Sequence, residues 1–273
     1  MKKFSCASIQ MVSSGDVNAN LLEAGRLIEK AAHEGASLVV LPENFALMGE
    51  TDTAKLAIAE PEGQGPIQAF LAQTAKDTGV WIIGGTVPLQ AEGGKVYASC
   101  LVIDNQGKQV ARYDKIHLFD VDVPGTNEQY RESNTIAAGA NSLVVSTPFG
   151  MLGVAICYDL RFPELFRSMS RNGLDLLAIP AAFTAKTGHA HWDVLIRARS
   201  IENLCYTIAS NQGGRHSNGR ETYGHSMIVD PWGNVLNSQA QGAGVVLAEI
   251  DTDQIKRTRD VFPVLLHRRL SAC

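Results

Sequence analysis

Short apolar segments with the spacing of β-strands recur along the whole chain and alternate, in its first third, with segments that have the spacing of helices. Predicted strands at 4–10, 38–41 and 81–86 are separated by predicted helices near 21–32 and 66–75, where apolar residues line one face. A strand that is followed by a helix and a further strand returns to the same sheet as a parallel neighbour. The opening of the chain therefore predicts an α/β fold.

Hairpins replace the crossover helices in the middle of the chain. Predicted strands at 96–103 and 109–113 flank Asp104-Asn105-Gln106-Gly107, whose Asn and Gly tolerate turn geometry, and a second hairpin is predicted over 143–156. The remaining predicted elements are a helix after Pro163, a helix near 189–203, and strands at 174–179, 206–209, 227–229 and 245–250, the last two on either side of the turn at 230–234.

No linker, repeat or low-complexity segment divides the 273 residues, and 45% of them are apolar, which is enough for one large core. We predict a single domain over residues 1–273, with two sheets packed face to face and helices on both outer faces, an α-β-β-α sandwich. The longest segment without periodicity is 118–141. A loop of that length inside a compact domain is usually functional, and we expect this one to be so.

Charge and cysteine content argue against several classes of protein. The 24 basic and 28 acidic residues give a net charge of −4, so no general attraction to nucleic acid or to an anionic membrane is expected. The start of the chain lacks the long apolar stretch of a signal peptide. Five cysteines without a CxxC pair favour neither a disulfide framework nor a zinc site. We expect a cytoplasmic protein in which Cys6, Cys100 and Cys205 are core residues.

Cys157 has a different setting from the other cysteines. It ends the apolar run 152–156 and precedes Tyr158-Asp159-Leu160-Arg161-Phe162-Pro163, so the thiol stands on a tight turn from a strand into a helix. Such a turn exposes the side chain and directs backbone N–H groups towards it, which suits a nucleophile and its oxyanion. The same pattern also fits a cysteine that only fills space in the core.

Two charged residues also follow predicted strands. Glu43 comes directly after the strand at 38–41, where it is placed to act as a base whose pKa burial can raise, although an exposed loop glutamate would look the same. Lys115 closes the strand at 109–113 and could equally form a surface ion pair with Asp114.

Together with Cys157, these residues form a complete set for acyl transfer. The carboxylate of Glu43 takes the thiol proton, the thiolate attacks an amide carbon, and the ammonium of Lys115 holds the oxyanion. Each residue follows a separate strand, and the ends of neighbouring strands are where active sites of α/β proteins converge. We therefore predict that the three side chains meet.

The segments that carry these residues resemble the signature segments of the nitrilase (carbon–nitrogen hydrolase) superfamily and occur in the same order. They are Leu41-Pro42-Glu43-Asn44-Phe45, Tyr113-Asp114-Lys115-Ile116-His117-Leu118 and the run 153–165 around Cys157. The resemblance implies Glu43 as base, Lys115 as oxyanion stabiliser and Cys157 as nucleophile. It also implies a second active-site glutamate, which we place at Glu132, that positions Lys115 and the substrate amide. Tyr158 is assigned as a further auxiliary residue.

Within this superfamily, the sequence is most similar to the branch of deaminated-glutathione amidase and omega-amidase. Segments 117–125, 187–192 and 214–227 and the tail at 261–269 carry that similarity. It implies hydrolysis of a linear amide through a cysteine thioester, with deaminated glutathione giving 2-oxoglutarate and Cys-Gly. The alternative is an omega-amidase that acts on 2-oxoglutaramate or 2-oxosuccinamate. Asp114 departs from the branch, whose animal members usually have a basic residue there, and it could weaken the field of the lysine or face solvent.

The substrate implied is a small amide that bears a carboxylate. In this branch the arginine that matches Arg161 is expected to bind the keto-acid end, whereas the residues alone would also allow an ion pair with Asp159 or Glu164. Phe183 and Thr184 are predicted as further substrate contacts. The loop at 213–220 is either solvated or a lid whose Arg215 and Arg220 contact the substrate carboxylate.

No metal or organic cofactor is expected, since His189 and His191 lie on different faces of a helix and no HExxH motif accompanies them. Two other classes stay open: a papain-like thiol hydrolase, in which a histidine activates Cys157, and a catalytically silent scaffold. The apolar segment 261–266 suggests subunit contacts, and the resemblance implies a homodimer or a larger homo-oligomer.

Overall fold

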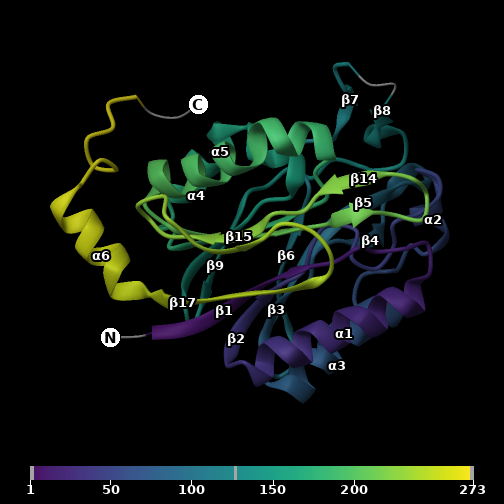
Figure 1. Cartoon of the computed structure of the whole chain (residues 1–273), viewed down its shortest axis with the longest axis horizontal. Coiled ribbons are helices and arrows are strands. Elements are labelled where there is room, and N and C mark those ends of the chain that lie inside the picture. Colours follow the sequence, from purple (N-terminus) through teal and green to yellow (C-terminus); the bar gives the residue numbers. More distant parts are fainter. Residues whose placement is uncertain (1–2, 126–127, 271–273) are drawn as a thin grey trace.

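Two β-sheets pack face to face in the computed structural model, which describes residues 3–125 and 128–270 (Figure 1). The strands of the first sheet are β17 (Gly244–Asp251), β1 (Lys3–Gln10), β2 (Ala36–Val40), β3 (Trp81–Ile83), β5 (Val96–Ile103) and β4 (Val87–Gln90), in that order, with β6 (Gln109–Asp114) also paired to β5. Those of the second sheet are β16 (Val235–Gln239), β15 (Ser226–Val229), β12 (Tyr206–Asn211), β11 (Leu176–Ala181), β10 (Gly150–Val154) and β9 (Leu143–Thr147).

Helices cover the outer face of each sheet. Helices α1 (Val17–His33) and α3 (Pro66–Thr78) lie on the first sheet, and α4 (Pro163–Ser170) and α5 (Ala185–Asn203) lie on the second (Figure 1). The predicted α-β-β-α layering is confirmed. None of the described helices combines the length and the apolar character that crossing a membrane requires.

The segment 38–41, which comprises the end of β2 and the following Leu41, is a continuous apolar run for a structural reason. Leu38 and Val40 point between the two sheets, whereas Val39 and the following Leu41 pack in the cluster beneath α1 and α3. Successive side chains of a strand point to opposite faces, and both faces of this sheet are covered, so all four positions from 38 to 41 are apolar. The predicted core cysteines Cys6, Cys100 and Cys205 are buried as free thiols for the same reason.

The C-terminal strands are arranged differently from the prediction. The turn at 230–234 joins β15 to β16, and the strand predicted at 245–250 is β17, which pairs antiparallel with β1 in the other sheet. Strand β16 was not predicted because it is an exposed edge strand of mixed polarity, without the apolar alternation that a half-buried strand shows.

The remaining elements are short or lie on the surface. They are α2 (Ala54–Ala57), α6 (Thr252–Val261) and two small hairpins, β7 (Asp120–Asp122) with β8 (Gln129–Arg131) and β13 (Gly213–Arg215) with β14 (Glu221–Tyr223). The segment 118–141 therefore contains a hairpin of its own.

Candidate active site

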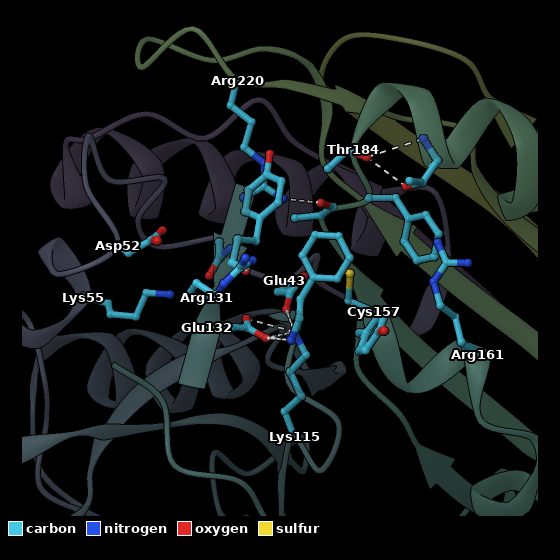
Figure 2. A pocket seen from close by; sticks show the side chains of 17 residues that line it. Glu43, Asp52, Lys55, Lys115, Arg131, Glu132, Cys157, Arg161, Thr184 and Arg220 are labelled. Carbon is cyan, nitrogen blue, oxygen red and sulfur yellow. Dashed lines mark hydrogen bonds and ion pairs between the residues drawn. The ribbon is translucent and has the colours of Figure 1, made fainter. Parts of the chain in front are cut away.

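Glu43, Lys115 and Cys157 line one pocket, whose space is about 550 Å³ when the part that is open to solvent is included (Figure 2). Glu43 follows β2 and Lys115 follows β6, both in the first sheet, whereas Cys157 follows β10 in the second. The expectation that neighbouring strands would carry them is wrong, because β3 and β5 separate β2 from β6. The three side chains meet because two packed sheets present these strand ends to the same space.

The backbone at Cys157 is in the left-handed region, with φ of +47°. This conformation is uncommon for a residue with a side chain and occurs mainly at tight turns and functional sites. Cys157 is the first residue of a 3-10 turn, Cys157–Arg161, which leads into α4 at Pro163, as predicted. The turn leaves Cys157 only 8% exposed, at the floor of the pocket.

Asp159 fixes this turn in place. Its fully buried carboxylate accepts hydrogen bonds from the Ile156 N–H at 2.9 Å, the His117 N–H at 3.0 Å and the Tyr113 hydroxyl at 2.7 Å. The His117 ring also contacts it, through Nδ1 at 2.7 Å. Because Tyr113 and His117 flank Lys115, this carboxylate ties the nucleophile turn of one sheet to the lysine segment of the other.

Replacing Asp159 by alanine is expected to lower the free energy of unfolding by about 3–5 kcal/mol, because several buried donors lose their acceptor. Urea denaturation measures this change. Asp193→Ala is the matched control, since Asp193 is half-exposed and its ion pair with Arg197, one helical turn away, is worth less than about 0.5 kcal/mol. Equal losses in the two variants would contradict the role given to Asp159.

Lys115 is 1% exposed and bonded to two glutamates. Its Nζ donates to Glu43 Oε1 at 2.8 Å and to Glu132 Oε1 and Oε2 at 2.9 and 2.8 Å. The alternative ion pair with Asp114 is wrong, since that carboxylate pairs with Arg112 at 2.8 Å. The alternative of an exposed Glu43 is also wrong, because this side chain is 4% exposed.

The pKa shifts describe the charge balance around the thiol. Burial disfavours the charged form of Lys115, but the carboxylates of Glu132 and Glu43 outweigh it and hold the pKa of the ammonium well above its ordinary value. Burial also opposes ionisation of Glu132, yet Lys115 and Lys55 lower the pKa of this carboxyl. Burial and the charge of Glu43 raise the pKa of the Cys157 thiol well above its ordinary value. The proton of the resting site therefore lies on sulfur, beside a carboxylate that can accept it.

The segment 118–141 contributes one wall of the pocket, with Phe119, Tyr130, Arg131 and Glu132. Glu132 is held by the backbone N–H of Phe119, which donates to its Oε2 at 2.8 Å. A carboxylate that is fixed in this way orients the ammonium to which it is bonded, because Lys115 makes two of its three contacts with Glu132.

The predicted substrate contacts line the opposite wall. The guanidinium of Arg161 lies over the rings of Phe183, at 5.3 Å, and Tyr158, at 5.8 Å, and its Nη1 is 3.1 Å from His191 Nδ1. Within the described residues it forms no ion pair with Asp159 or with Glu164, so the structural alternative for Arg161 is not observed. Thr184 caps helix α5 and also lines the pocket.

Three charged pocket residues were not predicted as site residues, namely Asp52, Lys55 and Arg131, and Arg220 was predicted only as one of two alternatives. Asp52 and Lys55 lie in and just before the four-residue helix α2, which has no periodicity that could mark them. The alternative of a solvated loop is wrong for Arg220, whose guanidinium donates to the Ala182 carbonyl at 2.7 Å and lies over Tyr130.

Neither a metal site nor a histidine base accompanies these residues. Across residues 3–125 and 128–270, no group of three His, Cys, Asp or Glu side chains could hold a metal ion. The described residues that line the pocket include no histidine, which a papain-like thiol hydrolase would need beside its cysteine.

A buried thiol beside a paired carboxylate and ammonium, at the junction of two helix-covered sheets, is a set of groups that suits hydrolysis of a carbon–nitrogen bond. Comparison with known proteins agrees. The carbon–nitrogen hydrolase family model matches residues 5–260. Deaminated glutathione amidase of Synechocystis sp. is 46% identical over 272 residues, which cover 98% of this chain and 99% of that protein.

Two solved structures are also similar. The Caenorhabditis elegans NitFhit protein has a TM-score of 0.91 and 37% identity, covering 98% of this chain and 65% of that one. Saccharomyces cerevisiae Nit3, a member of branch 10 of the nitrilase superfamily, has a TM-score of 0.88 and 31% identity, covering 98% and 97%. The chain belongs to the carbon–nitrogen hydrolase family, and the predicted enzyme class, a hydrolase of amide bonds, is confirmed.

Proposed function

We propose that this protein is a deaminated-glutathione amidase, which hydrolyses deaminated glutathione to 2-oxoglutarate and Cys-Gly. The name of the Synechocystis relative supports this substrate. The observation that carries the proposal is the position of Arg161, which lines the pocket that contains Cys157 and is not paired with a carboxylate from any residue that the structure describes. It is available to bind the carboxylate of a 2-oxo acid while the distal amide faces the thiol.

In the proposed mechanism, Glu43 accepts the proton of Cys157 as sulfur attacks the amide carbon. Lys115 and a backbone N–H stabilise the oxyanion of the tetrahedral intermediate, while Glu132 keeps Lys115 in position. Glu43 then returns the proton to the amine nitrogen, the C–N bond breaks and a thioester remains. Glu43 next deprotonates a water molecule that attacks the thioester, and the acid and the free thiol are regenerated.

The wall formed by Tyr158, Phe183 and Thr184 supports the same orientation of substrate. Two rings flank the guanidinium of Arg161 and restrict it to one direction, so a planar carboxylate is bound with defined geometry. Intact glutathione carries an ammonium where deaminated glutathione carries a neutral keto group. Its positive charge would face Arg161, and we expect it to be rejected by about a hundredfold or more.

The test is a comparison of kcat/KM for deaminated glutathione, 2-oxoglutaramate, glutathione and an aliphatic nitrile. Deaminated glutathione is expected to be preferred, and Arg161→Lys, which keeps the charge but loses the bidentate contact, is expected to lower its kcat/KM by about tenfold. Preference for 2-oxoglutaramate would assign the protein as an omega-amidase. Preference for the nitrile, or indifference to Arg161→Lys, would contradict the carboxylate contact.

We also propose that residues 1–273 form one domain and that the protein acts in the cytoplasm as at least a homodimer. Its substrate is a small amide, and we expect it to need no nucleic acid, membrane, metal or organic cofactor. Val261, Phe262 and Leu266 have exposed apolar side chains, and the ring of Phe262 packs against that of the exposed Trp232, which supports subunit contacts through the C-terminal tail. The described cysteines are free thiols, the form that a reducing cytoplasm maintains. A monomeric mass in sedimentation velocity would contradict the dimer.

A further inference from the structure

The wall of the pocket across from Arg161 contains a lysine without a partner. Lys55 points into the pocket, and its ammonium makes no hydrogen bond or ion pair with any described residue (Figure 2). The nearby carboxylate of Glu132 is already bonded to Lys115 and to a backbone N–H. Burial lowers the pKa of Lys55, while the charge of Glu132 acts in the opposite direction. A half-buried ammonium without an acceptor is costly to maintain unless a ligand supplies one.

Arg220 is a second cation with a free donor on this wall. Its Nη2 donates to the Ala182 carbonyl at 2.7 Å and its Nη1 to Met48 Sδ at 3.9 Å, but its Nε is buried and has no hydrogen-bond partner among the described residues. The neighbouring Arg131 differs, because its guanidinium is already used by Asp122 and by the carbonyls of Val121 and Tyr130. Among the described residues, Lys55 and Arg220 therefore have no carboxylate paired to them on this side, whereas Arg131 is already paired with Asp122 at 2.7 Å.

The cations lie on both sides of the nucleophile. In Figure 2, Arg161 is on one side of Cys157, and Lys55 and Arg220 are on the other. An amide that places its acyl carboxylate at Arg161 and its carbonyl carbon at the thiol directs its nitrogen, and whatever the nitrogen carries, away from Arg161. The leaving amine therefore extends towards Lys55 and Arg220.

We propose that Lys55 and Arg220 bind a carboxylate on the amine side of the scissile bond. This inference rests on the proposed function and narrows its substrate class to amides with an anionic group at both ends, whose leaving group is a peptide with a free C-terminal carboxylate. Ammonia as the leaving group leaves both cations unpaired. The contacts of Lys55 and Arg220 would then distinguish an amidase that releases a peptide from an omega-amidase. The acyl half of the substrate alone does not distinguish these two enzymes.

The plain alternative is that Lys55 only offsets the negative charge of Glu43 and Glu132. In that case its replacement would alter the field at Cys157 and change turnover of every substrate by the same factor. A role in binding the carboxylate changes only the substrate that carries the carboxylate, and it changes KM more than kcat.

The experiment compares two substrates that differ at one position, deaminated glutathione and its C-terminal carboxamide. The wild-type protein is expected to favour the carboxylate by about 10–100-fold in kcat/KM, the range of a charge-assisted contact. Lys55→Met is expected to bring this ratio close to one through KM, and Lys55→Arg to restore most of it. Lys76→Met, which removes an exposed lysine from the last turn of α3, is expected to keep the wild-type ratio. An unchanged ratio in Lys55→Met, or equal losses on both substrates, would overturn the inference.

A binding measurement separates this inference from the proposed reaction. Calorimetry on Cys157→Ala gives the ratio of Kd values for the same two ligands without turnover. The same measurement on Cys157→Ala/Lys55→Met shows how much Lys55 contributes to this ratio. If the wild-type protein hydrolyses neither amide, the proposed function fails, and the Kd ratio still decides the role of Lys55. Loss of discrimination in the double variant supports the carboxylate site, whereas discrimination that persists, or that is absent from the single variant, overturns it.

Discussion

Cys157→Ala is expected to abolish hydrolysis of every amide substrate, with a loss of about 10⁴-fold or more in kcat, because no other group in the pocket can form the thioester. The fold should be kept, since the change removes one atom at a site that touches the pocket. The loss is measured by chromatography of the Cys-Gly that is released. Rapid quenching of the wild-type reaction should yield protein whose mass is increased by a 2-oxoglutaryl group.

The control for this experiment is Cys205→Ala. Cys205 is a buried free thiol outside the pocket, between α5 and β12, so its replacement should leave an enzyme that turns over normally. Hydrolysis near the wild-type rate in Cys157→Ala, or a trapped acyl group on a different residue, would refute the assignment of Cys157 as nucleophile. The scaffold alternative predicts no acyl adduct in any variant.

Removing the ammonium of Lys115 is expected to reduce kcat by at least about a hundredfold, the usual cost of losing a donor to an oxyanion. The structure adds a second consequence that the sequence did not indicate. Lys115→Met removes the one ammonium that is hydrogen-bonded to both Glu43 and Glu132 among the described residues and leaves only the charge of Lys55 nearby, so we expect a loss of about 3–5 kcal/mol in the free energy of unfolding. Steady-state kinetics and urea denaturation measure the two effects separately.

The two effects of Lys115 can be separated by a second substitution. In Lys115→Met/Glu132→Gln, one of the two stranded charges is gone, so much of the stability should return while the activity stays low. If activity returns together with stability, the lysine acts only by holding the site together. If the double variant remains as unstable as the single one, the charge balance described for this pocket is incorrect.

The layering of the fold is largely determined by local sequence. Strands such as 38–41 are apolar at every position because each is covered on one face by the other sheet and on the other face by helices. The turn after Cys157 is marked by the apolar run that ends at this cysteine and by the proline at which α4 begins. Glu132 was predicted only from the resemblance to the nitrilase superfamily, because the sequence around it has no apolar periodicity and is typical of an exposed segment.

Other features were decided only by the tertiary structure. Strand β17 joins β1 in the first sheet, and a pairing between the two ends of the chain leaves no local pattern in the residues themselves. Lys55 and Arg220 reach the pocket from a four-residue helix and a small hairpin that are far apart in sequence. Local periodicity reports which faces of an element are buried, whereas the identity of its neighbours depends on how the two sheets stack. The state of Lys115 follows from that stacking, because an ammonium that looks like a surface charge in sequence is enclosed by carboxylates from the segments that follow β2 and β8.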